Sequence, residues 1–178
     1  MPNWCYNYVI ITLPTADLYN KLLESVENKN WFSTFVPLGT EIDDDGNEVW
    51  DYDTACVKWG TKWEANEIEV CNNDYDTLTV NLSFDTAWSP PFYLYDTMFE
   101  EKNIFTTAYY YESGQEFFGK YELSDVNKID DHYGYPSDKE ELENLKKMIS
   151  SDTYDFMECE FEGLLERWEE EENDDNQT

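Results

Sequence analysis

The sequence predicts a mixed α+β fold, and three patterns support this prediction. Residues 4–13, WCYNYVIITL, are rich in β-branched and aromatic side chains, which is typical of a strand. Residues 66–71 (NEIEVC) and 78–84 (LTVNLSF) alternate apolar with polar side chains, as strands with one buried face do. Apolar residues at helical spacing follow the first strand, at Leu18, Leu22, Leu23 and Val26.

Turn and cap residues delimit these elements. Pro14 ends the first strand, and Thr15 is expected to cap the helix that follows. The turn-forming residues NNDYD join the two alternating strands into a hairpin. SPP begins a second helix with Ser89 as N-cap, because proline in a first helical turn loses no hydrogen bond. The expected buried stripe of this helix consists of Leu94, Tyr95, Met98 and Phe99.

Two further strands follow the second helix, IFTTAYYY (104–111) and EFFGKYEL (116–123), joined through a Ser-Gly turn. The element order is then β-α-β-β-α-β with one additional edge strand, which predicts a ferredoxin-like, split βαβ antiparallel sheet. This domain is expected to span residues 1–123 and to carry an insertion at 30–65. It implies no iron–sulfur cluster, because the sequence lacks the clustered cysteines that hold one.

Residues 124–178 are predicted to form an acidic helical extension. A capping box at Ser137–Glu140 begins one helix, and a break at 150–152 precedes a second. We expect the extension to pack on the sheet domain through an apolar stripe, and the tail from Glu169 onward to fray. The stripe comprises Leu142, Leu145, Met148, Ile149, Met157, Phe161, Leu164, Leu165 and Trp168.

Charge restricts the classes of function. The 178 residues include 41 Asp and Glu against 11 Lys and Arg, a formal net charge of −30. Direct binding to DNA, RNA or an anionic membrane is excluded, because it requires cationic side chains that displace counterions from phosphates. Arg167 is the only arginine, so bidentate phosphate recognition has almost no donor. The expected partner is therefore basic, and a protein surface that normally binds nucleic acid fits this requirement.

The cysteines and apolar runs indicate an intracellular, soluble chain. Cys5, Cys56, Cys71 and Cys159 form no CxxC pair, and the start MPNWCYNYVI is too short and polar for a signal peptide. We therefore expect reduced thiols and a cytoplasmic location. The longest apolar runs fall short of the roughly 20 residues that span a bilayer.

Three motifs occur in a distinctive order: MPNWCYN at the start, KWGTKWEA in the insertion and FDTAWSPP before the second helix. Through them, residues 1–122 resemble the phage- and plasmid-borne YubB/Api92-like proteins with a ferredoxin-like domain. YYYESGQEFFGKY is similar to the closing hairpin of that family. The resemblance implies the fold and an origin in a mobile genetic element, hence the cytoplasm of a host cell. It implies no catalytic residues and does not extend to the acidic segment after residue 123.

Two of the scarce lysines stand among tryptophans in CVKWGTKWEA (56–65). Lys58 and Lys62 could bind an anionic ligand between Trp59 and Trp63. The interpretation we favour is structural: the lysines neutralise nearby carboxylates and lie across indole faces, each contact contributing about 0.5–1 kcal/mol. The structural motif would then tie the insertion to the sheet by packing Trp4, Trp59, Lys62, Trp63 and Trp88 together.

Metal and catalytic sites find little support in the sequence. EIDDDGNEVWDY matches a calcium loop at Glu41, Asp43, Asp45 and Gly46, but its eighth position is Glu48 rather than an apolar residue and its twelfth is Tyr52 rather than glutamate. A hairpin turn at Asp45–Gly46 is favoured, and weak divalent binding stays open. His132, the only histidine, has no cysteine at metal-ligand spacing and is expected in an exposed linker. We predict no enzyme, no cofactor and no metal site.

The remaining candidate site is the acidity itself. Residues 138–175 contain 16 acidic and 4 basic side chains. As a helix they would carry one carboxylate per about 3.6 Å, against one charge per about 1.7 Å in duplex DNA. The alternative interpretation is a solvated face that aids solubility or tolerance of high salt. The predicted partner-binding carboxylates are Asp43, Asp44, Asp45, Glu48, Asp51, Asp152, Asp155, Glu158, Glu162, Glu166, Glu169 and Glu170.

Three functional hypotheses follow. The first is a non-enzymatic nucleic-acid mimic, an anti-restriction or anti-CRISPR inhibitor that occupies the basic groove of a host defence protein. The alternative is a small ligand- or protein-binding module that uses the aromatic-rich sheet and insertion, with acidity only for solubility. The third is a metal-dependent enzyme that uses acidic clusters.

Overall fold

The computed structural model describes residues 3–39, 41–42, 45, 48–49 and 51–175. The chain divides into two compact units, Met1–His132 and Tyr133–Thr178. Among the described residues, the first has a mixed α+β fold, and the second contains two helices.

Six strands form the main sheet of the described chain: β1 (Trp4–Thr12), β4 (Asn66–Asp74), β5 (Thr79–Ala87), β6 (Phe105–Glu112), β7 (Phe117–Leu123) and β8 (Lys128–Gly134). Their spatial order is β4-β5-β1-β6-β7-β8, with β1 antiparallel to both β5 and β6. The predicted α+β class is confirmed, and so are the hairpins formed by β4 with β5 and by β6 with β7.

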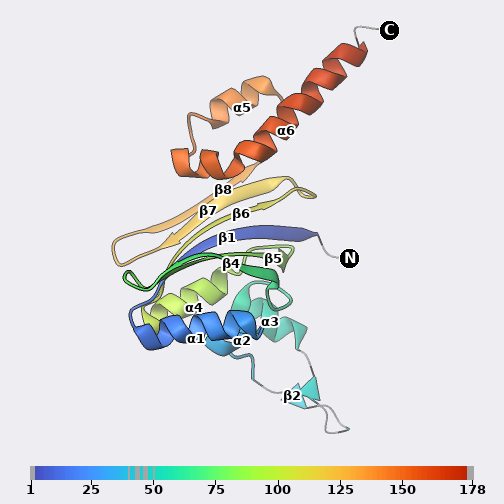
Figure 1. The fold of residues 1–178 in the computed structure, drawn as a ribbon. Helices are drawn as coiled ribbons and strands as arrows, with labels where there is room; N and C mark the ends of the chain where they lie inside the picture. The colour runs from blue at the N-terminus through green and yellow to red at the C-terminus, as the bar shows by residue number, and fades with distance from the viewer. Residues whose placement is uncertain (1–2, 40, 43–44, 46–47, 50, 176–178) are drawn as a thin grey trace. The chain divides into compact units, whose positions relative to one another are not determined.

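One face of the sheet forms the core. Along β1, Cys5, Asn7, Val9 and Ile11 are fully buried, whereas the side chains between them are partly exposed. Because side chains alternate along a strand, the buried set shares one face. The helices that cover this face are α1 (Ala16–Glu27), α2 (Trp31–Phe35), α3 (Tyr52–Trp59) and α4 (Phe92–Lys102) (Figure 1).

Helix α1 begins where the sequence predicts. The Oγ1 atom of Thr15 accepts a hydrogen bond from the Leu18 amide at 3.3 Å and caps the helix. Leu22 and Val26 are buried together with Tyr19, as their helical spacing requires. The α1 prediction is therefore confirmed.

The predicted cap of the next long helix was wrong. Helix α4 begins at Phe92 with Pro91 in the N-cap position. The Ser89 hydroxyl instead donates to the carbonyl oxygen of Gly60 at 2.8 Å, which joins α4 to the insertion. A residue that precedes proline is pushed out of the helical region, so Pro90 cannot begin a helix before Pro91.

The insertion contains helices as well as the predicted hairpin. Strands β2 (Glu41–Ile42) and β3 (Glu48–Val49) pair antiparallel between α2 and α3, although Gly46 lies outside the described residues. Helix α3 ends at Trp59, and its C-cap is Gly60, whose φ of +85° is readily accessible only to glycine.

Aromatic residues of the insertion belong to the core. Trp31 and Phe32 of α2 and Trp59 of α3 are fully buried. Glu64 closes the insertion, because its carboxylate accepts hydrogen bonds from the amides of Phe32 at 2.6 Å and Ser33 at 3.1 Å. The insertion is thus anchored at both ends to the helical layer.

Strand β8 was not predicted. Ile129 and Asp131 are half-buried and alternate with exposed neighbours, so β8 is an amphipathic edge strand whose charged residues obscure its period. His132 lies in this strand, with its Nδ1 atom 3.2 Å from the Tyr110 hydroxyl. His132 is exposed, as expected, but it lies in a strand rather than in a linker.

The second unit contains α5 (Lys139–Leu145) and α6 (Ser151–Asp175). The cap of α5 is Asp138, one residue later than predicted: its Oδ1 accepts a hydrogen bond from the Glu141 amide at 2.8 Å. Glu141 in turn accepts a hydrogen bond from the Ser137 amide at 2.8 Å. Helix α6 continues through Asp175, so the prediction that the chain frays from Glu169 was wrong.

Candidate functional site

A row of exposed carboxylates runs along α6. At about 100° per residue, five acidic side chains of this helix fall within a sector about 80° wide. All five are exposed to solvent. This row, the α6 stripe, consists of Asp155, Glu158, Glu162, Glu166 and Glu169.

The α6 stripe is linear and separate from the buried side of the helix. Met157, Phe161 and Leu164 are buried on that other side. From Asp155 to Glu169 the stripe rises about 21 Å, which gives one carboxylate per about 5 Å. One strand of DNA carries one phosphate per about 3.4 Å of helix axis. The stripe thus reaches about two-thirds of that linear charge density.

The stripe lowers the stability of its own helix. Within the described chain, none of its five carboxylates takes part in a hydrogen bond or an ion pair. Glu158, Glu162 and Glu166 are spaced i,i+4, where like charges destabilise a helix by about 0.2–0.5 kcal/mol per pair. The last turn of α6 has no basic residue, although the helix dipole favours cations there.

Two other predicted carboxylates of α6 lie beside the stripe. Glu170 is exposed next to its edge. Asp152 is half-buried in the first turn, where its Oδ1 accepts a hydrogen bond from the Thr153 amide at 3.1 Å. Asp152 is thus held by the start of the helix and is not part of the stripe.

The predicted carboxylates of the insertion do not form one described surface. Those outside the described residues are Asp43, Asp44 and the side chain of Glu48. Asp45 is exposed in a turn. Asp51 caps α3, because it accepts hydrogen bonds from the Asp53 amide at 2.9 Å and from the Thr54 hydroxyl. Asp51 therefore has a structural role that residue type alone did not reveal.

Lys62 lies inside an aromatic cage. Its Nζ atom is 4.4 Å from the ring centroid of Trp63 and 5.4 Å from those of Tyr52 and Trp88. We call these three rings the Lys62 cage. Trp4 extends it, with a ring centroid 6.1 Å from that of Trp63.

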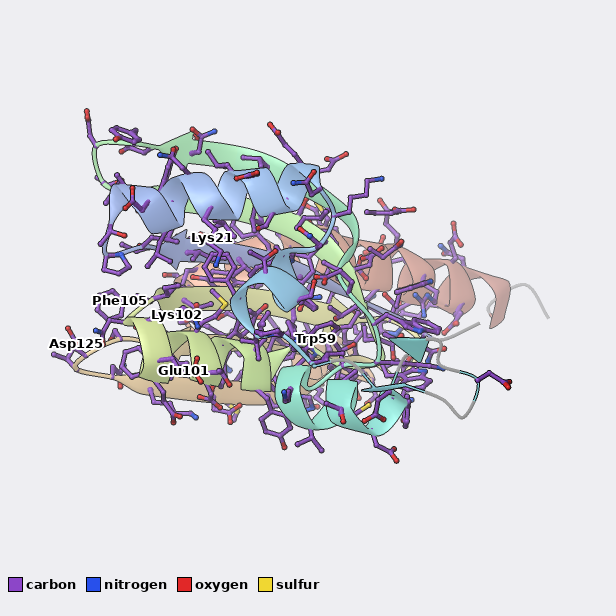
Figure 2. All side chains as sticks on the ribbon, turned by 90° about the horizontal axis from the view of Figure 1, so that it is seen from below. Lys21, Trp59, Glu101, Lys102, Phe105 and Asp125 are labelled. Atoms are coloured by element: carbon purple, nitrogen blue, oxygen red, sulfur yellow. The ribbon has the colours of Figure 1, made fainter. Side chains whose placement is uncertain are left out.

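The other members of this sequence motif have different environments. The Lys58 ammonium donates to the carbonyl oxygens of Pro37 and Leu38, both at 3.0 Å, instead of lying across an indole. The Nε1 atom of Trp59 donates to the carbonyl oxygen of Val36 at 2.7 Å, and the indole packs edge-on against Phe32. Figure 2 labels Trp59, the last residue of α3. Trp59 is therefore a core residue.

Half of the ten lysines lie over aromatic rings. In the described chain these are Lys21, Lys62, Lys120, Lys128 and Lys146. The sequence reveals such a contact only where a lysine neighbours a tryptophan. The contacts of Lys128 with Tyr121 and of Lys146 with Tyr154 form only when the chain folds. Three of these lysines also pair with carboxylates outside the α6 stripe: Lys120 with Glu122, Lys128 with Asp96 and Lys146 with Glu143.

A cavity of about 390 Å³ lies beside the N-terminus of α4. Its polar centre is Asp96, which accepts hydrogen bonds from the Tyr121 hydroxyl at 2.7 Å and from the Lys128 ammonium at 3.1 Å. Burial raises the pKa of Tyr121, and the contacts with Tyr121 and Asp96 raise the pKa of Lys128. Sequence reasoning missed this network, which ties α4 to β7 and β8.

Comparison of the chain with protein-family models, curated proteins and solved structures finds no match. Among the described helices, none has the length and apolar character needed to cross a membrane. Within the described ranges, no group of three or more His, Cys, Asp or Glu side chains is placed to hold a metal ion. The functional interpretation therefore depends on two surfaces, the α6 stripe and the Lys62 cage.

Proposed function

We propose that this protein is a non-enzymatic inhibitor that mimics nucleic acid. Its acidic surface occupies the basic groove of a host defence protein that binds DNA or RNA, such as a restriction or CRISPR nuclease. The observation that carries the proposal is the α6 stripe, a row of exposed carboxylates that form no ion pair within the described chain. Complementary charge of this kind gives fast, salt-sensitive association.

The stability cost of the stripe supports a role in binding. Solubility alone is served equally well by carboxylates interspersed with lysines, which also pair favourably along a helix. A continuous row instead leaves repulsion that a cationic groove relieves. Binding to such a groove therefore gains free energy that folding of the helix alone does not.

We also infer a ferredoxin-like topology and an origin in a mobile genetic element. The order β4-β5-β1-β6, with α1 and α4 as connecting helices, supports the split βαβ arrangement. The motif resemblance of residues 1–122 supports the mobile-element origin and a location in the host cytoplasm. Such elements have to resist host nucleases, which act by binding nucleic acid.

A binding module that uses the insertion is the second candidate. It is favoured by the exposure of Trp4, Tyr52 and Trp88, which are 38%, 44% and 39% exposed. Large exposed rings on a highly charged surface are typical of contact sites. In this case the acidity serves solubility, and binding responds to loss of Trp88 rather than to salt.

A competition assay tests the first proposal. Fluorescently labelled DNA is bound to a panel of restriction and CRISPR nucleases, and its release is followed by anisotropy as the protein is added. We expect release from at least one nuclease, and weaker release at higher salt. Replacing Glu162 and Glu166 together by lysine reverses two charges of the stripe and should abolish release.

Exposed acidic residues outside the stripe provide a matched control. Glu24 and Glu27 are exposed on α1, and replacing both by lysine changes the net charge by the same amount. Equal loss in the two double variants would show that overall charge acts rather than the stripe. Undiminished release by the α6 variant, or no release from any nuclease, would contradict the proposal.

A further inference from the structure

Among the described residues, the ammonium of Lys62 is held by ring faces. Within the described chain Lys62 has no hydrogen bond or ion pair, and its contacts are the rings of Tyr52, Trp63 and Trp88. Several aromatic faces around one cation are the arrangement that proteins use to recognise ammonium groups. The cage is therefore built for a cation, and the cation in it is replaceable because no carboxylate of the described residues fixes it.

The backbone of Trp88 is strained. Its φ is +70°, a left-handed conformation that is an outlier for a bulky residue. The Trp88 amide donates to the carbonyl oxygen of Asn3 at 3.0 Å, which holds the residue in place. The strained backbone places the indole at the surface, 39% exposed, where it gains little from the core. Strain of this kind concentrates at ligand clamps and other functional sites.

We propose that the Lys62 cage is a receptor for a lysine or arginine side chain of a basic protein partner, and that Lys62 fills the cage in the free protein. The net charge of −30 attracts basic partners. Exposed tryptophan and tyrosine paired with a partner's cationic side chain are frequent sources of binding energy in interfaces. The proposal shares a basic partner with the α6 stripe but rests on different residues.

Exchange of the two cations explains why Lys62 does not block the site. When the partner's side chain enters, the flexible Lys62 side chain returns to water, so one cation replaces another over the same rings. The partner also covers the exposed edges of Trp88 and Tyr52, which Lys62 leaves open to solvent. Removing Lys62 should therefore leave the cage vacant and increase its apparent affinity for a cation.

A titration with tetramethylammonium chloride tests this proposal without a partner. The indole N–H signals of Trp63 and Trp88 are followed by nuclear magnetic resonance, with sodium chloride at the same ionic strength as the control. We expect Lys62→Ala to bind the probe about fivefold more tightly than the wild type. Lys62→Arg should behave as the wild type, and Lys62→Ala combined with Trp88→Ala should not respond.

Indole signals of Lys62→Ala that move no further than they do in sodium chloride would overturn the proposal. If Lys62→Ala does not fold, the same titration is carried out on Lys62→Met, which keeps the length of the side chain and removes its charge. Indole shifts larger than those in sodium chloride would support the proposal, and shifts no larger would overturn it. The experiment involves neither α6 nor a nuclease. Its failure would therefore leave the proposed inhibitor function standing, and failure of the competition assay would leave the cage standing.

Discussion

The hydroxyl of Tyr110 on β6 donates a hydrogen bond to the main-chain carbonyl oxygen of Asp131 on β8, at 3.2 Å. The side chain of Tyr110 crosses the intervening strand β7 at Gly119, its partner in the β6–β7 register. A Cβ atom at Gly119 would overlap both the Tyr110 hydroxyl and the Asp131 carbonyl oxygen. Gly119 therefore allows β8 to join the edge of the sheet.

Gly119→Ala should destabilise the first unit. The added methyl group has to displace Tyr110 or β8, and overpacking of this kind costs about 1–3 kcal/mol. Urea unfolding measures the loss, and hydrogen exchange should show it first in the amides of β8.

Gly163→Ala is the control, because Gly163 lies in α6 with nothing within 4 Å of an added Cβ. It should stabilise its helix by about 0.5–1 kcal/mol. A Gly119→Ala protein as stable as the wild type would contradict this account.

Most of the sheet domain was predictable, because β1 is rich in β-branched and aromatic residues and β5 alternates apolar with polar residues. β8 was not, because Ile129 and Asp131 share its inner face and a charged residue there breaks the pattern. The continuation of α6 was missed for a different reason. Repeated glutamates indicated fraying, yet glutamate is a good helix former and the helix runs through Asp175.

The candidate site was predictable only by residue type. Helical geometry places Asp155 and Glu162 in one row, whereas Asp51 and Asp152, which have the same chemistry, accept hydrogen bonds from backbone amides. A carboxylate just before a helix or in its first turn can cap the helix or point to solvent. Residue type and spacing do not show which of the two it does. The long-range contacts of Lys62 with Trp88 also depend on the fold.

Glu64 should make stability fall as pH rises. Burial raises the pKa of Glu64, and the amides of Phe32 and Ser33 only partly offset this. The folded protein then binds a proton that the unfolded chain releases near its ordinary pKa of about 4.3. The stabilisation is present below that pH and is lost as pH rises through the raised pKa. Urea unfolding at several pH values should give a shallower dependence for Glu64→Gln.

Glu141 provides a control of opposite sign. Hydrogen bonds from Ser137 lower the pKa of Glu141, so its contribution is present above its ordinary pKa and is lost as pH falls through the lowered value. Glu141→Gln should therefore flatten the acid end of the profile instead. Profiles that do not differ between wild type and Glu64→Gln would show that burial of this carboxyl has no effect on stability.

Two tryptophans should differ in their effect on folding. Trp59 is fully buried and donates a hydrogen bond to Val36, so Trp59→Ala should cost about 3–5 kcal/mol. Trp88→Ala removes a ring that is 39% exposed, with its contacts to Lys62 and Tyr52, and should cost less than Trp59→Ala. Thermal unfolding compares the two variants. Similar losses would mean that Trp88 is a core residue and not part of an accessible cage.

Glu162→Lys should stabilise α6 while weakening the inhibitor. The substitution converts the repulsive i,i+4 pairs with Glu158 and Glu166 into attractive ones, a gain of about 1 kcal/mol at low ionic strength. Hydrogen exchange of the α6 amides measures this gain, which should shrink near 1 M salt, where the screening length falls to about 3 Å. Glu162→Gln, which removes repulsion without adding attraction, should give about half the effect.

A helix that becomes more stable while its protein loses DNA release would show that the α6 stripe is maintained for binding at the expense of folding. A variant with no gain in protection at low salt would mean that the stripe carries no unrelieved repulsion, and the physical basis for a cationic partner would be lost.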